Sequence, residues 1–378
     1  MASGLRTTLT DTTTDRRSVS DMISMIDPLE LPLIAYLGLD GSSKIRLVSW
    51  PNFKYEHLED SLAAKTTTCA EAIDTTETDI DVTDGTLFRV GDIILIDSEM
   101  MWVTSITSDT ITVVREYHGD LATGDSHDNA STITWISSAR LEGALSGDSP
   151  STDVTSVTGY TQIFWKSVQV SRTQSKTSKY GIDDDYDYQV AKCLTNGGKA
   201  GELPRALEMA AFYGTAYAGT AANARTMAGL NTLITTNETA AASAALTRKM
   251  IEDSLQTAWT AGGSPTTIIC NAWAKRKITS FYEGSARTDR ETSMGGMVID
   301  RIETEFGIVD ILMDRYCPSS SLFIIDESKV GFLTFDDWFV EDLAKTGDSR
   351  KGQVVGEFGF FVANQTAHAK ITGFSTTK

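Results

Sequence analysis

The chain has 378 residues, of which 41% are hydrophobic and 22% are charged, and its formal net charge is −18. This composition is typical of a globular protein long enough for two or three domains. The excess of carboxylates repels phosphate and argues against a protein that reads nucleic-acid sequence. It suits a protein that stays soluble at high concentration, or one that lines a compartment holding DNA.

The sequence has no signal of a secreted or membrane protein. The N-terminal stretch MASGLRTTLTDTTTDRR has no apolar core, and no apolar run is long enough to cross a bilayer. Cys69, Cys193, Cys270 and Cys317 have neither metal-ligand nor redox spacing. Free thiols in a reducing cytoplasm are the expectation.

Residues 1–45 are predicted to form an extended arm, because Pro28 and Pro32 prevent one long helix through its apolar patch. The next segment, residues 45–62, begins with strand character and ends in polar residues. Residues 159–174 alternate apolar and polar side chains, as a long strand does. We expect these two segments to pair as a long hairpin.

A small all-β unit is predicted at the tip of this hairpin, in residues 67–136. Its sequence is rich in Thr, Ile, Val, Asp and Ser, and residues 88–116 predict a three-strand meander with short turns. The segment STITWI at 131–136 adds a further strand. These patterns indicate a small β-barrel or sandwich inserted into the rest of the fold.

Residues 183–214 have helical periodicity that is interrupted by TNGGKAGELP. A glycine inside a helix costs about 1 kcal/mol and a proline about 3 kcal/mol relative to alanine. We therefore expect two helices, or one helix with a sharp break.

The last third of the chain mixes helices and strands. LTRKMIEDSLQTAWTAGG predicts an amphipathic helix that ends at Gly262, TTIICNA a buried strand and AWAKRKITSFYE a second helix. Strands are then predicted in MVIDRIETEF, GIVDILMD, SLFIID and KGQVVGEFGFFVANQTAHAKITGF. The order indicates an α+β fold without the regular βαβ alternation of nucleotide-binding sheets.

No motif supports an enzyme or a bound cofactor. Residues 79–85, DIDVTDG, begin like a calcium loop, but Asp84 stands where glycine is needed and Val90 where glutamate is needed. Lys345-Thr346-Gly347 matches one β-lactamase element, and its Ser-x-x-Lys partner is absent. The histidines lack metal-ligand spacing. We expect no catalytic, cofactor or metal site.

The acidic cluster GIDDDYDYQVAK has two interpretations. Asp183 as N-cap, with Asp184 and Asp185 in the first turn, would accept free backbone N–H groups and favour the positive end of the helix dipole. A cation site would need ligands that converge, whereas consecutive helical residues diverge by about 100°. The helix start is the preferred interpretation, with Lys176 or Lys179 as possible cationic neighbours.

Several motifs, in order along the chain, together resemble a known family. They are YEHLEDSL, VSRTQSKTSKYGIDDDYDYQVAK, ELPRALEMAAFYG, NAWAKRKITSFYEG, IDRIETEFGIVDILMDRYCP and EDLAKTGDSRKGQVVGEFGFFVANQTAHAKITGF. This set, which covers about two thirds of the chain, is similar to tailed-bacteriophage major capsid proteins of the Hong Kong 97 fold. More specifically, these stretches resemble the branch typified by the SU10 phage major capsid protein. TNGGKAG departs from the family's continuous spine helix, and residues 67–135 replace a simple hairpin.

The resemblance implies a division of the chain into capsid-protein parts. These are an N-terminal arm (1–45), an extended loop (46–66 and 137–178), the inserted β domain (67–136), a peripheral domain with the spine helix (179–260 and 341–378) and an axial domain (261–340). It also implies self-assembly as hexamers and pentamers into an icosahedral shell around phage double-stranded DNA.

The resemblance further implies partners and a location. The chain would contact copies of itself, a portal and possible decoration or scaffolding proteins, and DNA only by weak non-specific contact, without a membrane. It would be part of the virion and assemble in the host bacterial cytoplasm. Trp50, Tyr55, Phe164 and Trp165 are the candidate inter-subunit contacts, because aromatic residues often anchor interfaces. The alternative is that they pack within their own subunit.

Other functions remain open at this point. The chain could be a different phage structural component, such as a tail-tube or decoration protein, although a long central helix argues against the mostly β tail tubes. The inserted β domain could bind host glycans. A hydrolase has no supporting motif.

Overall fold

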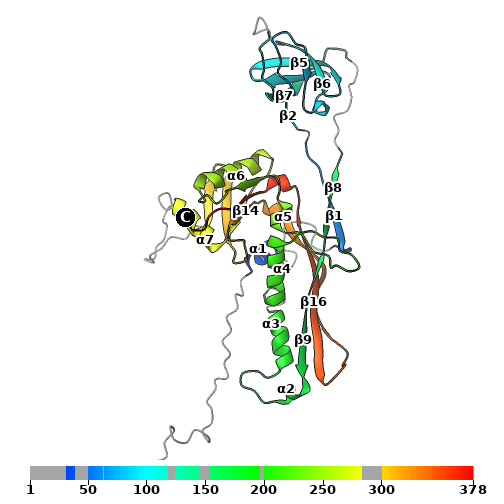
Figure 1. The fold of residues 1–378 in the computed structure, drawn as a ribbon, viewed down its shortest axis with the longest axis vertical. Coiled ribbons are helices and arrows are strands. Elements are labelled where there is room, and N and C mark those ends of the chain that lie inside the picture. Colours follow the sequence, from blue (N-terminus) through cyan, green and yellow to red (C-terminus); the bar gives the residue numbers. More distant parts are fainter. Residues whose placement is uncertain are drawn as a thin grey trace, which may run out of the picture. The chain divides into compact units, whose positions relative to one another are not determined.

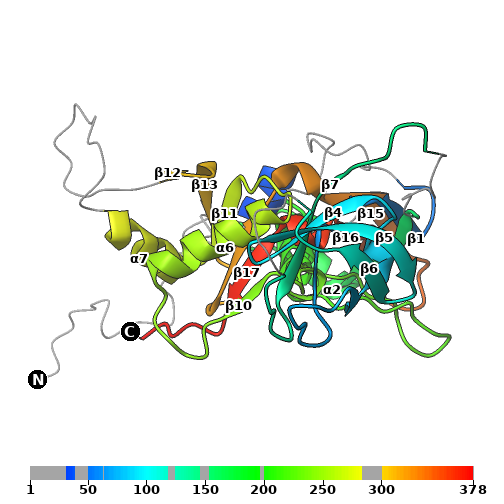
Figure 2. The ribbon, with the colours of Figure 1, turned by 90° about the horizontal axis from the view of Figure 1, so that it is seen from above.

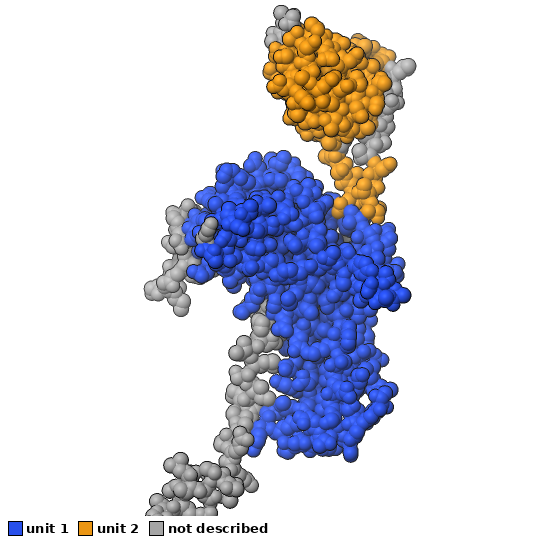
Figure 3. All heavy atoms as spheres, viewed as in Figure 1, with its two compact units in different colours: residues 1–57, 157–378 blue, residues 58–156 orange. Residues whose placement is uncertain are grey.

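The computed structural model describes residues 31–38, 50–62, 64–117, 124–144, 153–195, 200–282 and 300–377. The chain divides into two compact units (Figure 3). Unit 1 is Met1–His57 with Val157–Lys378, and unit 2 is Leu58–Ser156. Most of the predicted arm lies outside the described residues. Within it, the structure describes the short helix α1 (Pro32–Leu37), which buries Leu33, Ile34 and Leu37.

Unit 2 is built on one six-stranded sheet in the order β2-β7-β4-β5-β6-β3. An antiparallel bridge from Cys69 to Val82 joins the ends of its two edge strands, so the sheet closes on itself around a core that includes Ile94, Met101 and Ile111. The predicted meander is confirmed, and Asp97 and Ser108 have positive φ angles in its two turns. The bounds are β2 (Thr66–Thr68), β3 (Asp79–Asp81), η1 (Gly85–Leu87), β4 (Asp92–Ile96), β5 (Glu99–Thr107), β6 (Thr110–Val114) and β7 (Thr132–Ser138).

Unit 1 contains a second, mixed six-stranded sheet in the order β10-β17-β14-β11-β13-β12. The β10–β17 and β11–β13 pairs are parallel and the others antiparallel. Helices α6 (Arg248–Thr260) and α7 (Ala272–Tyr282) share one hydrophobic core with this sheet (Figure 2). The strands are β10 (Glu238–Ala240), β11 (Thr267–Cys270), β12 (Arg301–Thr304), β13 (Gly307–Met313), β14 (Ser321–Ile325) and β17 (Ala369–Thr372).

The division of unit 1 into a peripheral part (179–260 and 341–378) and an axial part (261–340) stays a prediction. Helix α6 and strands β10 and β17 pack with residues 267–325 in one continuous core. Helix α6 buries Ile251 and Leu255 in this core.

Three long strands form the other sheet of unit 1, in the order β15-β16-β9. They are β9 (Gln162–Ser171), β15 (Val330–Asp342) and β16 (Ser349–Val362). Strand β15 is missing from the sequence prediction. The short 3-10 turns η2 (Glu327–Lys329) and η3 (Gln365–Ala367) precede β15 and β17.

The predicted long hairpin is correct only at its outer part. Strand β8 (Thr155–Tyr160) pairs with β1 (Lys54–Glu59), but β9 pairs antiparallel with β16 instead of with the described residues 50–53. The physical reason is that β9 and β16 both present apolar side chains to the same core. Phe164, Val168 and Val170 on β9 are buried with Val354 and Phe358 of β16, which the polar β1 sequence KYEHLE does not offer.

Helices α3 (Asp185–Cys193) and α4 (Glu202–Tyr213) run along β9 and confirm the predicted break in the helical segment (Figure 1). Gly201 begins α4 with φ +110°, and a Cβ there would lie 2.6 Å from the Cys193 carbonyl oxygen. The two helices bury one side of their surface in the core that they share with the three-stranded sheet. The buried residues that follow the helical periodicity are Tyr186, Cys193, Leu203, Leu207 and Ala211. The remaining helices are α2 (Arg172–Lys176) and α5 (Leu230–Leu233).

Candidate assembly surface

The aspartate cluster starts helix α3, one residue later than predicted. Asp184, not Asp183, is the N-cap, and its carboxylate accepts the backbone N–H of Tyr186 at 2.7 Å and of Asp187 at 3.4 Å. Asp185 lies in the first turn and pairs with Lys179. Gly181 has φ +70° in the turn that precedes the cap. Asp183 lies outside the helix because the extended backbone needed at the cap falls on Asp184.

Tyr55 is a core residue of its own subunit rather than an exposed contact. It is buried with Leu333 and Phe361, and its hydroxyl donates to the carbonyl oxygen of Phe360. Burial raises the pKa of this hydroxyl. Gly159 leaves the space for the ring, because a Cβ there would collide with it.

Trp50 packs, half-buried, against the same small cluster. Its indole N–H donates to the Lys54 carbonyl oxygen at 3.3 Å, and its backbone N–H donates to the Thr334 carbonyl at 3.3 Å. These contacts hold the chain before β1 against β15. For Trp50 and Tyr55 the structure therefore favours packing within the subunit.

Phe164 is likewise buried between the sheet and the helices. Its ring meets Trp338 of β15 edge to face, with centroids 6.4 Å apart, and Trp338 lies 4.6 Å from Phe358. For Phe164 too the structure favours packing within the subunit, because the inward face of β9 is covered by α3 and α4.

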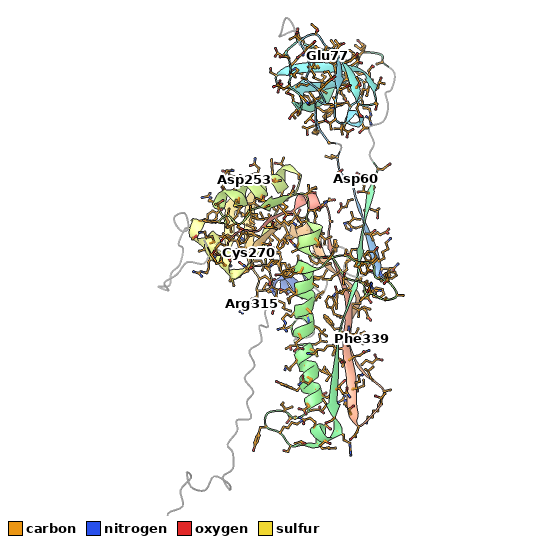
Figure 4. All side chains as sticks on the ribbon, viewed as in Figure 1. Asp60, Glu77, Asp253, Cys270, Arg315 and Phe339 are labelled. Atoms are coloured by element: carbon orange, nitrogen blue, oxygen red, sulfur yellow. The ribbon has the colours of Figure 1, made fainter. Side chains whose placement is uncertain are left out.

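Trp165 points to the opposite face of β9 and is 64% exposed. The strand register places Val355 of β16 beside it and Phe339 of β15 beside Val355, so the three side chains form one cross-strand row. Phe339 is 40% exposed, and it is labelled on its strand in Figure 4. Ile163 extends the same face at 47% exposure. We call Ile163, Trp165, Val355 and Phe339 the outer apolar row.

A buried ionic cluster holds this sheet in register at one end. Glu357 of β16 accepts hydrogen bonds from the Thr161 hydroxyl and the Arg225 guanidinium, and the Arg225 Nε donates to the Thr161 carbonyl at 3.1 Å. Thr161 separates β8 from β9 and is fully buried. The outer apolar row therefore lies on a fixed sheet.

The sequence predicts Trp165 as a candidate contact but does not single out its cross-strand neighbours Val355 and Phe339. Phe339 lies in β15, a strand that the sequence analysis does not predict. Val355 lies in a predicted strand, but the sequence of that strand does not show which of its faces is exposed to solvent. The alternation of apolar and polar residues along β9 is the sequence pattern that bears on which side chains share a face.

The described residues also bear on metal binding and on membrane insertion. No three His, Cys, Asp or Glu side chains gather there as a metal site. No described helix combines the length and the apolar character that a bilayer span requires.

Comparison with known proteins identifies the family. The family model "SU10 major capsid protein" matches residues 6–375. A search of curated protein sequences finds no match. The capsid of a native GTA particle is 9% identical, with 98% of this chain and 100% of that chain covered and a TM-score of 0.52.

Two further solved structures have lower TM-scores than the GTA capsid. A chain from Mycobacterium phage Cain is 13% identical, with 98% of both chains covered and a TM-score of 0.49. The SrpI encapsulin of Synechococcus elongatus PCC 7942 is 11% identical over 60% of this chain and 79% of that chain, with a TM-score of 0.43. The mixed α/β fold is similar to that of the GTA capsid chain, and the matched family is one of structural capsid proteins. The chain belongs to the SU10 major capsid protein family and is a phage major capsid protein, a component of the virion.

Proposed function

We propose that this chain self-assembles as hexamers and pentamers into an icosahedral shell that encloses phage double-stranded DNA. In this proposal α3 and α4 form the interrupted spine of a Hong Kong 97-type subunit. Residues 1–45 are the arm, and residues 46–66 and 137–178 the extended loop. Unit 2 contains the inserted domain predicted at 67–136. Assembly takes place in the host cytoplasm, with portal, decoration or scaffolding proteins as further partners.

The single observation that carries the proposal is the outer apolar row. The opposite face of the same sheet is packed against α3 and α4, whereas Trp165 and Phe339 are exposed to solvent. Monomeric proteins rarely leave aromatic side chains together on an open sheet, and such patches mark protein interfaces. Burying this row between copies removes apolar area from water in every subunit contact.

The charge of the chain supports a shell around DNA without tight DNA binding. A net charge of −18 disfavours close contact with phosphates, so packaged DNA meets the inner surface only weakly. Many modest contacts between copies, summed over a shell, supply the stability instead.

Negative-stain microscopy of the purified protein tests this proposal. We expect closed shells or ring-shaped capsomers, and Trp165→Ser should raise the protein concentration needed for assembly at least about tenfold, equivalent to about 1.4 kcal/mol. Trp259→Ser is the matched control, because Trp259 is 56% exposed but lies on α6, outside the row. Tubes in place of shells, or equal effects of the two variants, would contradict the proposal.

A glycan-binding role for unit 2 is a second candidate with one observation in its favour. Trp102 and Tyr117 lie with ring centroids 5.8 Å apart, and Tyr117 is 43% exposed. Paired aromatic rings of this kind can stack on sugars. Glycan-array binding by the assembled protein that is lost in Tyr117→Ser, with assembly unchanged, would support it.

A further inference from the structure

A charged hollow of about 400 Å³ lies in unit 1 where the segment between β15 and β16 meets helix α2. Four cationic side chains and two carboxylates line it: Arg172, Lys345, Arg350, Lys351, Asp342 and Asp348. The lining thus has an excess of positive charge in a chain whose net charge is −18. Because the hollow is positively charged in an otherwise acidic chain, it favours an anionic partner.

The two arginines of the hollow are held in place and keep unused donors. Arg172 Nε donates to Asp348 at 2.7 Å, and Arg350 Nη2 donates to Asp342 at 3.3 Å. The Arg350 guanidinium also lies 3.7 Å from the centroid of the Tyr186 ring. Each guanidinium has five N–H donors in a planar fork, so most of them remain available for a carboxylate or phosphate oxygen.

The two lysines add charge that the subunit does not neutralise. Neither Lys345 nor Lys351 forms an ion pair with a described residue, although Lys351 is partly buried beside the β15–β16 connection. The nearby Tyr186 hydroxyl and the Arg350 guanidinium lower the pKa of Asp342, so this carboxylate stays ionised. The spare positive charge of the hollow is therefore that of Lys345 and Lys351 together with the free arginine donors.

We propose that this hollow receives a carboxylate-bearing segment of a second copy of the chain. The inference rests on the proposed shell assembly, in which copies with 51 acidic and 33 basic residues must approach each other despite their like charge. A cationic hollow on each copy offsets that repulsion and fixes the register of the contact. A nucleic-acid backbone fits less well, because Asp342 and Asp348 in the lining would repel its closely spaced phosphates.

Zero-length crosslinking identifies the partner directly. A carbodiimide joins a lysine amine only to a carboxylate that touches it. Assembled particles made from equal amounts of ¹⁴N- and ¹⁵N-labelled protein should give mixed-isotope peptides that join Lys345 or Lys351 to an Asp or Glu. Only single-isotope crosslinks, or none at these lysines, would overturn the inference.

Charge reversal supplies the second test. Lys345→Glu with Lys351→Glu should raise the concentration needed for assembly at least about tenfold at low salt, while circular dichroism of the subunit stays unchanged. Arg276→Glu with Arg315→Glu is the matched control, since both arginines are exposed and form no ion pair with a described residue (Arg315 is labelled in Figure 4). An equal effect of the control pair would mean that net charge alone acts, and would refute a specific hollow.

Two outcomes separate this inference from the proposed function. If wild-type protein forms no shells, the proposed function fails. If shells form and the Lys345→Glu, Lys351→Glu variant assembles as wild type does, only the hollow is refuted. Normal assembly with loss of binding to a fluorescent DNA duplex would identify it as a phosphate site instead, which also overturns the inference.

Discussion

Glu208 of α4 and Asp314, which follows β13, place their carboxyl groups side by side in the interior of unit 1. Both side chains are fully buried, and Glu208 Oε2 and Asp314 Oδ2 have no hydrogen-bond partner in the described part of the chain. The other Glu208 oxygen accepts the Leu33 backbone N–H at 3.3 Å, and Tyr316 N–H donates to Asp314 at 2.7 Å. Burial, and then the Asp314 carboxyl, raise the pKa of Glu208 to about 10.

This pair predicts a stability that falls as the pH rises. The folded-state pKa of Glu208 lies above the ordinary value of 4.5, so the folded protein holds a proton that the unfolded chain has already lost. The contribution is fully present below about pH 4.5 and is lost progressively toward pH 10, with a slope of up to about 1.4 kcal/mol per pH unit. Urea unfolding of the subunit between pH 5 and 9 measures it.

Glu208→Gln provides the control for this pH effect. Glutamine keeps the shape and an N–H donor toward Asp314 but does not titrate, so the free energy of unfolding should depend less on pH. The variant should also be at least as stable as wild type at pH 8. If the free energy of unfolding of the variant changed with pH as steeply as that of wild type, another group would be the cause of the pH dependence.

The cap of α3 predicts different effects for neighbouring aspartates. Asp184→Ala should lower the free energy of unfolding by about 0.5–2 kcal/mol, because two backbone N–H groups lose their acceptor. Asp183→Ala should change it by less than about 0.5 kcal/mol, as Asp183 makes no cap. Thermal unfolding of both variants measures the difference, and a larger loss for Asp183→Ala would restore the original sequence prediction.

Gly356 predicts the effect of one added methyl group. A Cβ on this residue would lie 2.5 Å from Trp338 Cε3 and 2.7 Å from Phe358 Cε2. Because these rings are packed between sheet and helices, Gly356→Ala should destabilise the subunit by about 1–3 kcal/mol. Gly347→Ala is the control, since nothing lies within 4 Å of the Cβ position there. Chemical denaturation of the two variants should separate them clearly.

A buried ion cluster in unit 2 predicts acid sensitivity. Glu99 accepts hydrogen bonds from Arg115 Nε at 3.0 Å, Arg115 Nη2 at 2.7 Å and His127 Nε2 at 3.0 Å, while His127 Nδ1 lies 2.8 Å from Asp97. Burial on its own raises the pKa of Glu99, but Arg115, His127 and the Asp125 N–H outweigh it and lower the pKa.

The sign of the effect follows from the lowered pKa of Glu99. Its contribution to stability is present above the ordinary value of 4.5 and is lost as the pH falls through the folded-state pKa. Arg115→Met should cost about 3–5 kcal/mol at neutral pH, because it leaves Glu99 buried without its main cationic partner. Hydrogen exchange of β4, β5 and β6 in the full chain should report the loss, with the sheets of unit 1 as the internal control.

Features that depend on local residue spacing and on charge could be predicted from the amino-acid sequence. The meander at 88–116, the broken helix at 183–214 and the helix that stops at Gly262 follow from periodicity and from glycine and proline positions. The ordered motifs were enough to suggest the capsid family. The N-cap was misplaced by one residue, because three consecutive aspartates are equally good caps and only the backbone decides among them.

Only the tertiary structure decided which side chains are available to another subunit. In QIFWK the neighbours Phe164 and Trp165 are equally apolar, and strand alternation says that they face opposite ways without saying which way is covered. Helices α3 and α4 cover Phe164, and the strand β15, whose Asp336-Asp337 interrupts its apolar pattern, brings Phe339 into line with Trp165. Glu208 and Asp314 are likewise far apart in sequence, so the raised pKa of Glu208 depends on the packing that encloses both residues.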